Sequence, residues 1–184
     1  MGLCIHFTGS LNNKNQIEDL IDEVEDICKS MDWKYTILRE NWNEHDKNLT
    51  ALENRRFKGI TFKPHPESEN LTIFFDRIGR IASNTEIFFG EKTKPNYQFI
   101  KTQFAGTDVH IGVIQFLRYI KKKYIANLVV IDEANYWETN DRNKVDNYIN
   151  IVNKGINDIV GIAKNSTELN DFLNKLNKIF DSKK

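Results

Sequence analysis

Cysteine is scarce in this chain of 184 residues, which contains only Cys4 and Cys28. Two cysteines do not make the disulfide framework typical of small secreted domains, so we expect reduced thiols and a cytoplasmic location. The first residues carry no basic segment and only a short apolar stretch, which does not fit a secretory signal. No stretch approaches the roughly 18 consecutive apolar residues of a membrane-spanning helix. The sequence therefore predicts a protein without a membrane partner.

A net charge is also lacking, because 26 basic residues balance 26 acidic ones. The balance is uneven along the chain: residues 51–124 carry thirteen basic and seven acidic side chains. Such a segment can form a patch for an anionic ligand or a nucleic acid. Alternatively, its lysines and arginines lie on solvated strand edges, where charge discourages edge-to-edge pairing. We favour the second interpretation and do not expect a nucleic-acid partner, while an anion or nucleic-acid binder stays open as an alternative function.

Recognisable catalytic motifs are missing as well. No two histidines have the i, i+4 spacing of a zinc-binding helix, and there is no Cys-x-x-Cys pair. Residues 7–10 follow a predicted strand and precede a helix, but they lack the second glycine and the Gly-Lys-Ser/Thr ending of a phosphate-binding loop. No serine lies in a nucleophile elbow. We therefore predict no cofactor and lean towards a protein that is not an enzyme.

Hydrophobic periodicity is what the sequence does contain. Residues 3–8 alternate between apolar and polar side chains, which predicts a strand. From Ile17 to Met31 the apolar residues recur at steps of three and four, which predicts an amphipathic helix. Between residues 33 and 104 the period changes to two, with short breaks. This pattern predicts a five-strand antiparallel meander that includes residues 81–89 and 97–104.

The last third of the chain predicts a helix after Gly106, a buried strand within residues 127–132, and two C-terminal helices. The first C-terminal helix carries Val145 to Val160, and the second carries Leu169 to Phe180. No repeat or linker interrupts the chain. We therefore predict a single α+β domain over residues 1–184, in the order β-α-β(5)-α-β-α-α. Its antiparallel meander sheet of about six to seven strands is packed by two central helices, with two further C-terminal helices.

One segment combines acidic and aromatic side chains directly after the last predicted strand. It contains Asp132, Glu133, Tyr136, Trp137 and Glu138. Loops at strand ends commonly carry binding sites, and tyrosine and tryptophan supply large contact areas at low entropic cost. We therefore predict a binding or interaction protein that contacts a protein partner through this loop and the neighbouring sheet face. The alternative is structural: the two aromatic rings cover the core, and the acids face water or cap the next helix.

A second class of function would use a metal ion. If His110 pointed towards Glu133 and Glu138, the three could hold a divalent cation and support a metal-dependent hydrolase or nuclease. His110 shares the apolar stripe of its predicted helix, which also favours a hydrogen-bonded core residue. The metal site therefore requires distant residues to converge.

Overall fold

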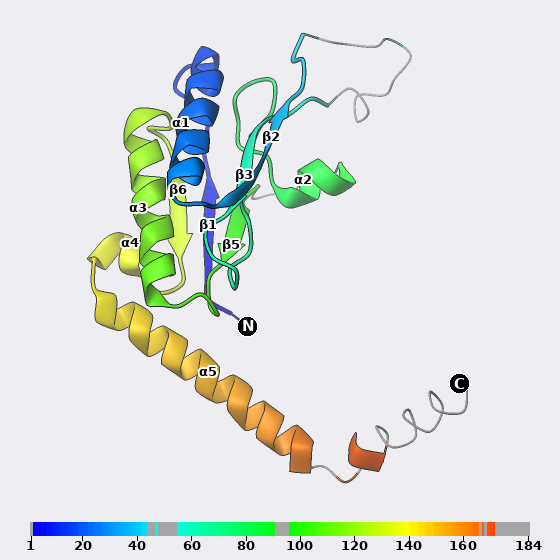
Figure 1. Ribbon diagram of the computed structural model, residues 1–184, viewed down its shortest axis with the longest axis vertical. Helices are drawn as coiled ribbons and strands as arrows, with labels where there is room; N and C mark the ends of the chain where they lie inside the picture. Colours follow the sequence, from blue (N-terminus) through cyan, green and yellow to red (C-terminus); the bar gives the residue numbers. More distant parts are fainter. Residues whose placement is uncertain are drawn as a thin grey trace.

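The computed structural model describes residues 2–43, 47, 55–90, 96–165, 167 and 169–171 (Figure 1). The strands in chain order are β1 (Cys4–Thr8), β2 (Lys34–Arg39), β3 (Lys58–Lys63), β4 (Leu71–Phe75), β5 (Gln98–Lys101) and β6 (Val129–Asp132). The helices are η1 (Lys14–Gln16), α1 (Ile17–Ser30), α2 (Asn84–Phe89), α3 (Thr107–Lys123), α4 (Tyr136–Thr139) and α5 (Arg142–Asn165). The α+β class is therefore confirmed.

The strands form two antiparallel sheets of three strands each, in the orders β5-β1-β6 and β2-β3-β4. The prediction of one meander sheet with six to seven strands is wrong in strand count and order. The N-terminal strand β1 lies at the centre of its sheet, with β5 and β6 both antiparallel to it. β5 and β6 therefore run parallel to each other, which requires the crossover that α3 supplies. Such a crossover cannot be read from local periodicity.

The second sheet is a local meander, as predicted, because its three strands follow each other in the chain. Gly59 in β3 has a φ of 153°, and a Cβ there would lie 2.0 Å from the carbonyl oxygen of Ile73 on β4. Only glycine permits this close approach of the two backbones. The two sheets meet beside β4 and β5, where the backbone N–H of Glu69 donates to the carbonyl of Lys101.

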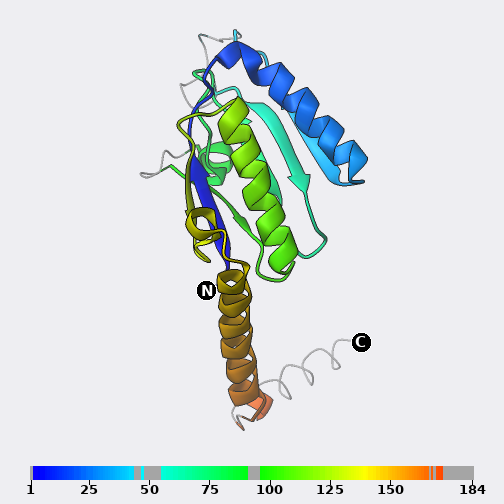
Figure 2. The ribbon, with the colours of Figure 1, turned by 90° about the vertical axis from the view of Figure 1, so that its left-hand side faces the viewer.

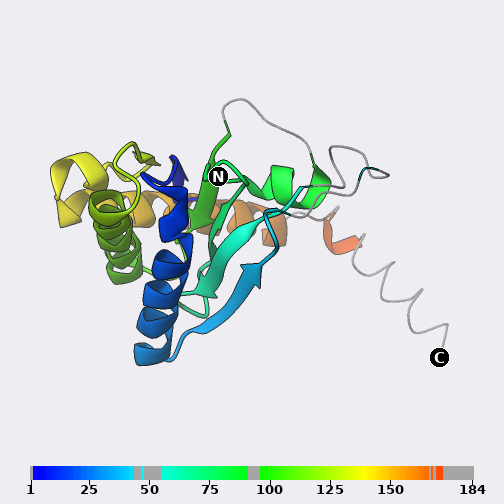
Figure 3. The same ribbon diagram turned by 90° about the horizontal axis from the view of Figure 1, so that it is seen from above.

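Helices α1 and α3 cover one side of the strands, as expected for the two central helices (Figures 1 and 3). Their apolar stripes, set by the three- and four-residue spacing, are buried: Ile17, Leu20, Ile21, Val24 and Cys28 on α1, and Val113, Ile114, Leu117 and Ile120 on α3. These side chains join those of β1, β3 and β4 in the main core. A smaller apolar cluster of Phe57, Phe74 and Ala82, with Leu38 and Ile87 packed on it, connects the second sheet to α2.

The prediction of a strand over residues 81–89 is wrong, because residues 84–89 form α2. Ser83 begins this helix as its N-cap: its side-chain oxygen accepts a hydrogen bond from the backbone N–H of Glu86. Gly90 ends it with a φ of 74°, in the left-handed region. The apolar pair Phe88 and Phe89 is exposed rather than packed between sheet neighbours. An apolar run of this length fits a buried strand and a short helix equally well, and here the cap residues determine the outcome.

The first predicted C-terminal helix is confirmed as α5, while the second falls largely outside the described residues. α5 packs its first turns against α3 and α4 and then extends away from the sheets (Figure 2). None of the helices described is long and apolar enough to cross a membrane.

Candidate functional site

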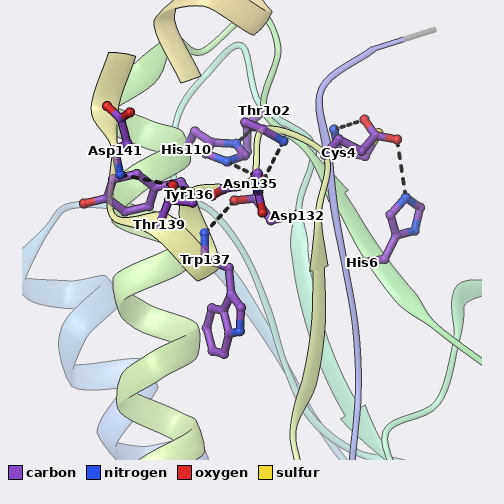
Figure 4. Close-up of polar contacts among 12 residues, drawn as sticks. Cys4, His6, Thr102, His110, Asp132, Asn135, Tyr136, Trp137, Thr139 and Asp141 are labelled. Atoms are coloured by element: carbon purple, nitrogen blue, oxygen red, sulfur yellow. Dashed lines mark hydrogen bonds and ion pairs between the residues drawn. The ribbon is translucent and has the colours of Figure 1, made fainter. Parts of the chain in front are cut away.

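Asp132 ends β6 with a fully buried carboxylate that organises the following loop (Figure 4). Its Oδ1 accepts a hydrogen bond from the backbone N–H of Ala134, and its Oδ2 accepts one from the N–H of Trp137, both at 2.9 Å. These bonds form the turn that leads from β6 into α4. The side chain therefore acts inside the protein rather than on its surface.

His110 on α3 supplies the third hydrogen bond to this carboxylate. Its Nε2 donates to Asp132 Oδ1 at 3.0 Å, and its Nδ1 lies 2.8 Å from the hydroxyl oxygen of Thr102. Burial raises the pKa of Asp132, but the hydrogen bond and charge of His110 and the two backbone N–H groups outweigh burial and lower it below its usual range. The network connects the end of β5, the first turns of α3 and the end of β6.

The order hydroxyl, imidazole, carboxylate resembles the order of groups in a hydrolytic triad. A nucleophile must be accessible to its substrate, and Thr102 and His110 are both 0% exposed. The arrangement instead satisfies three buried polar side chains at once, which favours a structural role. His110 is thus a hydrogen-bonded core histidine.

The two aromatic residues of the predicted binding loop lie against α3. Tyr136 is buried, and Trp137 is half-buried with its ring 5.5 Å from the guanidinium carbon of Arg118. Arg118 also donates a hydrogen bond of 2.7 Å to the carbonyl of Trp137. Glu138 is exposed on α4. Of the five predicted partner-binding residues, Asp132 and Tyr136 are therefore buried within the fold, and Glu133, Trp137 and Glu138 reach the surface.

Glu133 lies on the opposite face of the first sheet from His110, because side chains alternate along a strand. Its backbone N–H donates to the carbonyl of Cys4, and its Oε2 accepts a hydrogen bond of 2.8 Å from the Cys4 backbone N–H. Its Oε1 lies 3.9 Å from Nε2 of His6. Figure 4 shows Cys4 and His6 on the other side of β6 from His110.

The structure therefore does not bring together the predicted metal ligands His110, Glu133 and Glu138. Over the described part of the chain, the candidate ligand atoms that lie within 4.8 Å of one another in a group of three belong to Cys4, His6 and Glu133. The sequence alone did not predict that these three residues meet. The available signal was the i, i+2 spacing of Cys4 and His6, which places both side chains on one face of a strand.

Several cations of the basic segment are paired with carboxylates. Lys58 contacts Glu18 at 2.6 Å, and Arg80 contacts both Asp76 and Glu86 at 2.9 Å. Neutralisation of this kind lowers the positive potential that an anionic ligand would meet.

The exposed apolar surface of α5 is the other notable feature. Ile151, Ile159 and Val160 are 71%, 67% and 42% exposed, respectively. Val145, which begins the stripe that Ile159 and Val160 continue, is completely buried, whereas Ile151 lies on another side of the helix. The stripe thus begins in the core and continues along a helix that leaves the body of the protein (Figures 1 and 2).

Comparison with known proteins does not identify a family: no family model matches the chain, and neither the curated proteins nor the solved structures include a match.

Proposed function

We propose that this chain is an interaction protein that associates with a second copy of itself through the apolar face of α5. The observation that carries the proposal is the exposure of Ile159 and Val160 on a helix whose first turns are anchored in the core. Contiguous exposed apolar surface commonly marks a protein contact. The burial of Val145 and the contacts of α5 with α3 and α4 hold the first turns of the helix, which then extends away from the sheets.

The apolar face has the spacing of a helix-pairing seam. Ile149, Val152, Ile156 and Ile159 repeat at steps of three and four, while Lys154 lies on the opposite side of the helix. A seam free of charge does not repel its own copy, and a two-fold arrangement brings identical faces together. This self-complementarity favours a second copy over a partner of different sequence.

Gly155 gives an independent reason for a close helix contact. A glycine within a helix costs about 1 kcal/mol relative to alanine, and a Cβ at this position would meet nothing within 4 Å inside the protein. Within the described residues, packing does not explain this glycine. At the edge of the seam it lets a second helix approach closely.

The part of α5 that extends beyond the core is short, and this limits the affinity of the proposed dimer. From Ile151 to Asn165 the helix extends about 22 Å, at 1.5 Å per residue. A pair of such segments lies at the small end of specific interfaces, which need roughly 1,200 Å² in total. We therefore expect a reversible dimer with a dissociation constant in the micromolar range.

The acidic-aromatic loop contributes a smaller part of the proposed surface. Trp137 and Glu138 lie on α4, which contacts the first turns of α5, so they border the helix pair. Asp132 and Tyr136 support this surface from inside.

Sedimentation velocity of the full chain over a range of concentrations tests the proposal. We expect a monomer–dimer equilibrium, and we expect Ile159→Asp to give a monomer at every concentration. Ile78→Asp is the matched control, because Ile78 is 76% exposed but lies in the turn after β4. Trp137→Ala should weaken the dimer less than Ile159→Asp does. A wild-type monomer at about 100 µM, well above a micromolar dissociation constant, would refute self-association, and a dimer that survives Ile159→Asp would exclude the α5 face.

A further inference from the structure

The outer face of the first sheet carries a second constellation, at the end of β1 near the N-terminus. Cys4 and His6 point to the same side of β1, and the register pairs Ile5 with Asp132, so Glu133 lies level with Cys4. Cys4 and His6 lie on β1, and Glu133 is the first residue after β6. The backbone N–H of Glu133 donates to the carbonyl of Cys4, which holds Glu133 beside β1.

We propose that Cys4, His6 and Glu133 form a zinc-binding site. Thiolate, imidazole and carboxylate are the three donor types that zinc uses, at about 2.3, 2.0 and 2.1 Å. Tetrahedral coordination at those lengths separates the donor atoms by about 3.4 Å. The imidazole and carboxylate atoms are 3.9 Å apart, and all three donors lie within 4.8 Å of one another. Small rotations of exposed side chains bring them to coordination distance.

The remaining polar contacts of Glu133 are compatible with coordination. Oε2 is held by the Cys4 backbone N–H, which leaves Oε1 facing His6. A hydrogen bond to the second carboxylate oxygen orients a metal-binding carboxylate, as partners outside the coordination sphere do in known sites.

Three protein ligands leave the fourth position of a tetrahedral zinc open to solvent or to a small ligand. His6 lies between Phe99 on β5 and Ile131 on β6 in the register of the sheet, and both of these side chains are partly exposed. The proposed site therefore has apolar neighbours beside His6, while Lys101 is the register partner of Cys4 on β5. When zinc binds, the Cys4 thiol loses its proton to the solvent and the sulfur coordinates as the thiolate.

Cobalt(II) is the probe for the test, because a thiolate bound to it gives a charge-transfer band in the near ultraviolet. The tag-free full chain is reduced, freed of metal with a chelator and titrated with cobalt and then with zinc. We expect a band that saturates at one equivalent and disappears when zinc displaces cobalt. Zinc at 100 times its dissociation constant should also raise the melting temperature by about 5 °C or more.

Substitution of each proposed ligand tests whether that residue binds the metal. Cys4→Ser should lose the band, and His6→Ala and Glu133→Gln should weaken cobalt binding by about tenfold or more. Glutamine keeps an oxygen for the Cys4 backbone N–H, so Glu133→Gln preserves the local fold. Cys28→Ala and His65→Ala are the matched controls and should bind cobalt like the wild type.

A wild-type protein without the band, or a band that persists at full height in Cys4→Ser, would overturn the assignment. This inference does not depend on the proposed function, since Ile159→Asp removes the helix contact and leaves the three ligands intact. Loss of metal binding and loss of self-association are therefore distinguishable.

Discussion

Removal of His110 should destabilise the protein strongly, because it leaves the buried Asp132 carboxylate with only two backbone partners. Leucine in place of His110 removes the 3.0 Å hydrogen bond to Asp132 and fills the site with an apolar side chain of similar size. Leaving a buried carboxylate without one of its hydrogen-bond partners costs about 3 kcal/mol. Thr102→Val removes only the hydrogen bond between the hydroxyl and Nδ1 of His110, which should cost about 1 kcal/mol of stability. It is the comparison variant for His110→Leu.

Urea denaturation at neutral pH measures both changes. With a slope of about 2 kcal/mol per molar urea, His110→Leu should lower the midpoint by roughly 1.5 M and Thr102→Val by about 0.5 M. An unchanged slope would show that the variants alter stability and not the extent of unfolding. If His110→Leu costs no more than Thr102→Val, Asp132 does not depend on His110 and the reasoning is refuted.

The pH dependence provides a second readout of the same network. The pKa of Asp132 is lowered in the folded protein relative to about 3.9 in the unfolded chain. Near pH 4 the folded state therefore binds fewer protons, so this group's stabilisation is present above the unfolded pKa and is lost as pH falls through the folded value. The wild-type urea midpoint should fall between pH 5 and 3, and more steeply than that of His110→Leu. Parallel pH profiles would contradict the assigned cause.

Two further predictions concern other parts of the fold. Ser83→Ala removes the N-cap of α2 and should lower the free energy of unfolding by about 1 kcal/mol, which calorimetry would show as a melting temperature lower by about 2–4 °C. An unchanged melting temperature would mean that the cap is not needed. Burial, with the charge of Glu25, raises the pKa of Cys28 to about 11. A thiol reagent at pH 8 should therefore label Cys28 only after denaturation, and rapid labelling in the native protein would argue against its burial.

The helices that pack on the sheets were predictable because their pattern is local. The six apolar residues of α1, from Ile17 to Cys28, would be recognised in isolation, and their spacing alone places them on one face. The strands of the β2-β3-β4 meander were predictable for the same reason, since each pairs with its neighbour in the chain. In contrast, α2 was mistaken for a strand even though Ser83 and Glu86 have the spacing of a helix cap.

The candidate sites were predictable only in part. The sequence located the loop that begins at Asp132 but not the buried partner of its first carboxylate, which lies 22 residues earlier on α3. It also placed Cys4 and His6 on one strand face without indicating that Glu133 joins them. Hydrogen bonds between residues 129 positions apart leave no signal in local periodicity.

The sequence by itself determined the class of structure, the faces of α1 and α3 that are buried, and the amphipathic character of α5, because each depends on the spacing of apolar residues along a short segment. Only the tertiary structure decided that β1 lies between β5 and β6, and with it which side chains meet. That placement turns Asp132 inward to His110 and Glu133 outward to Cys4 and His6. The physical reason is that successive side chains of a strand point to opposite faces, so the pairing register, and not the sequence of the loop, assigns each carboxylate to its neighbours.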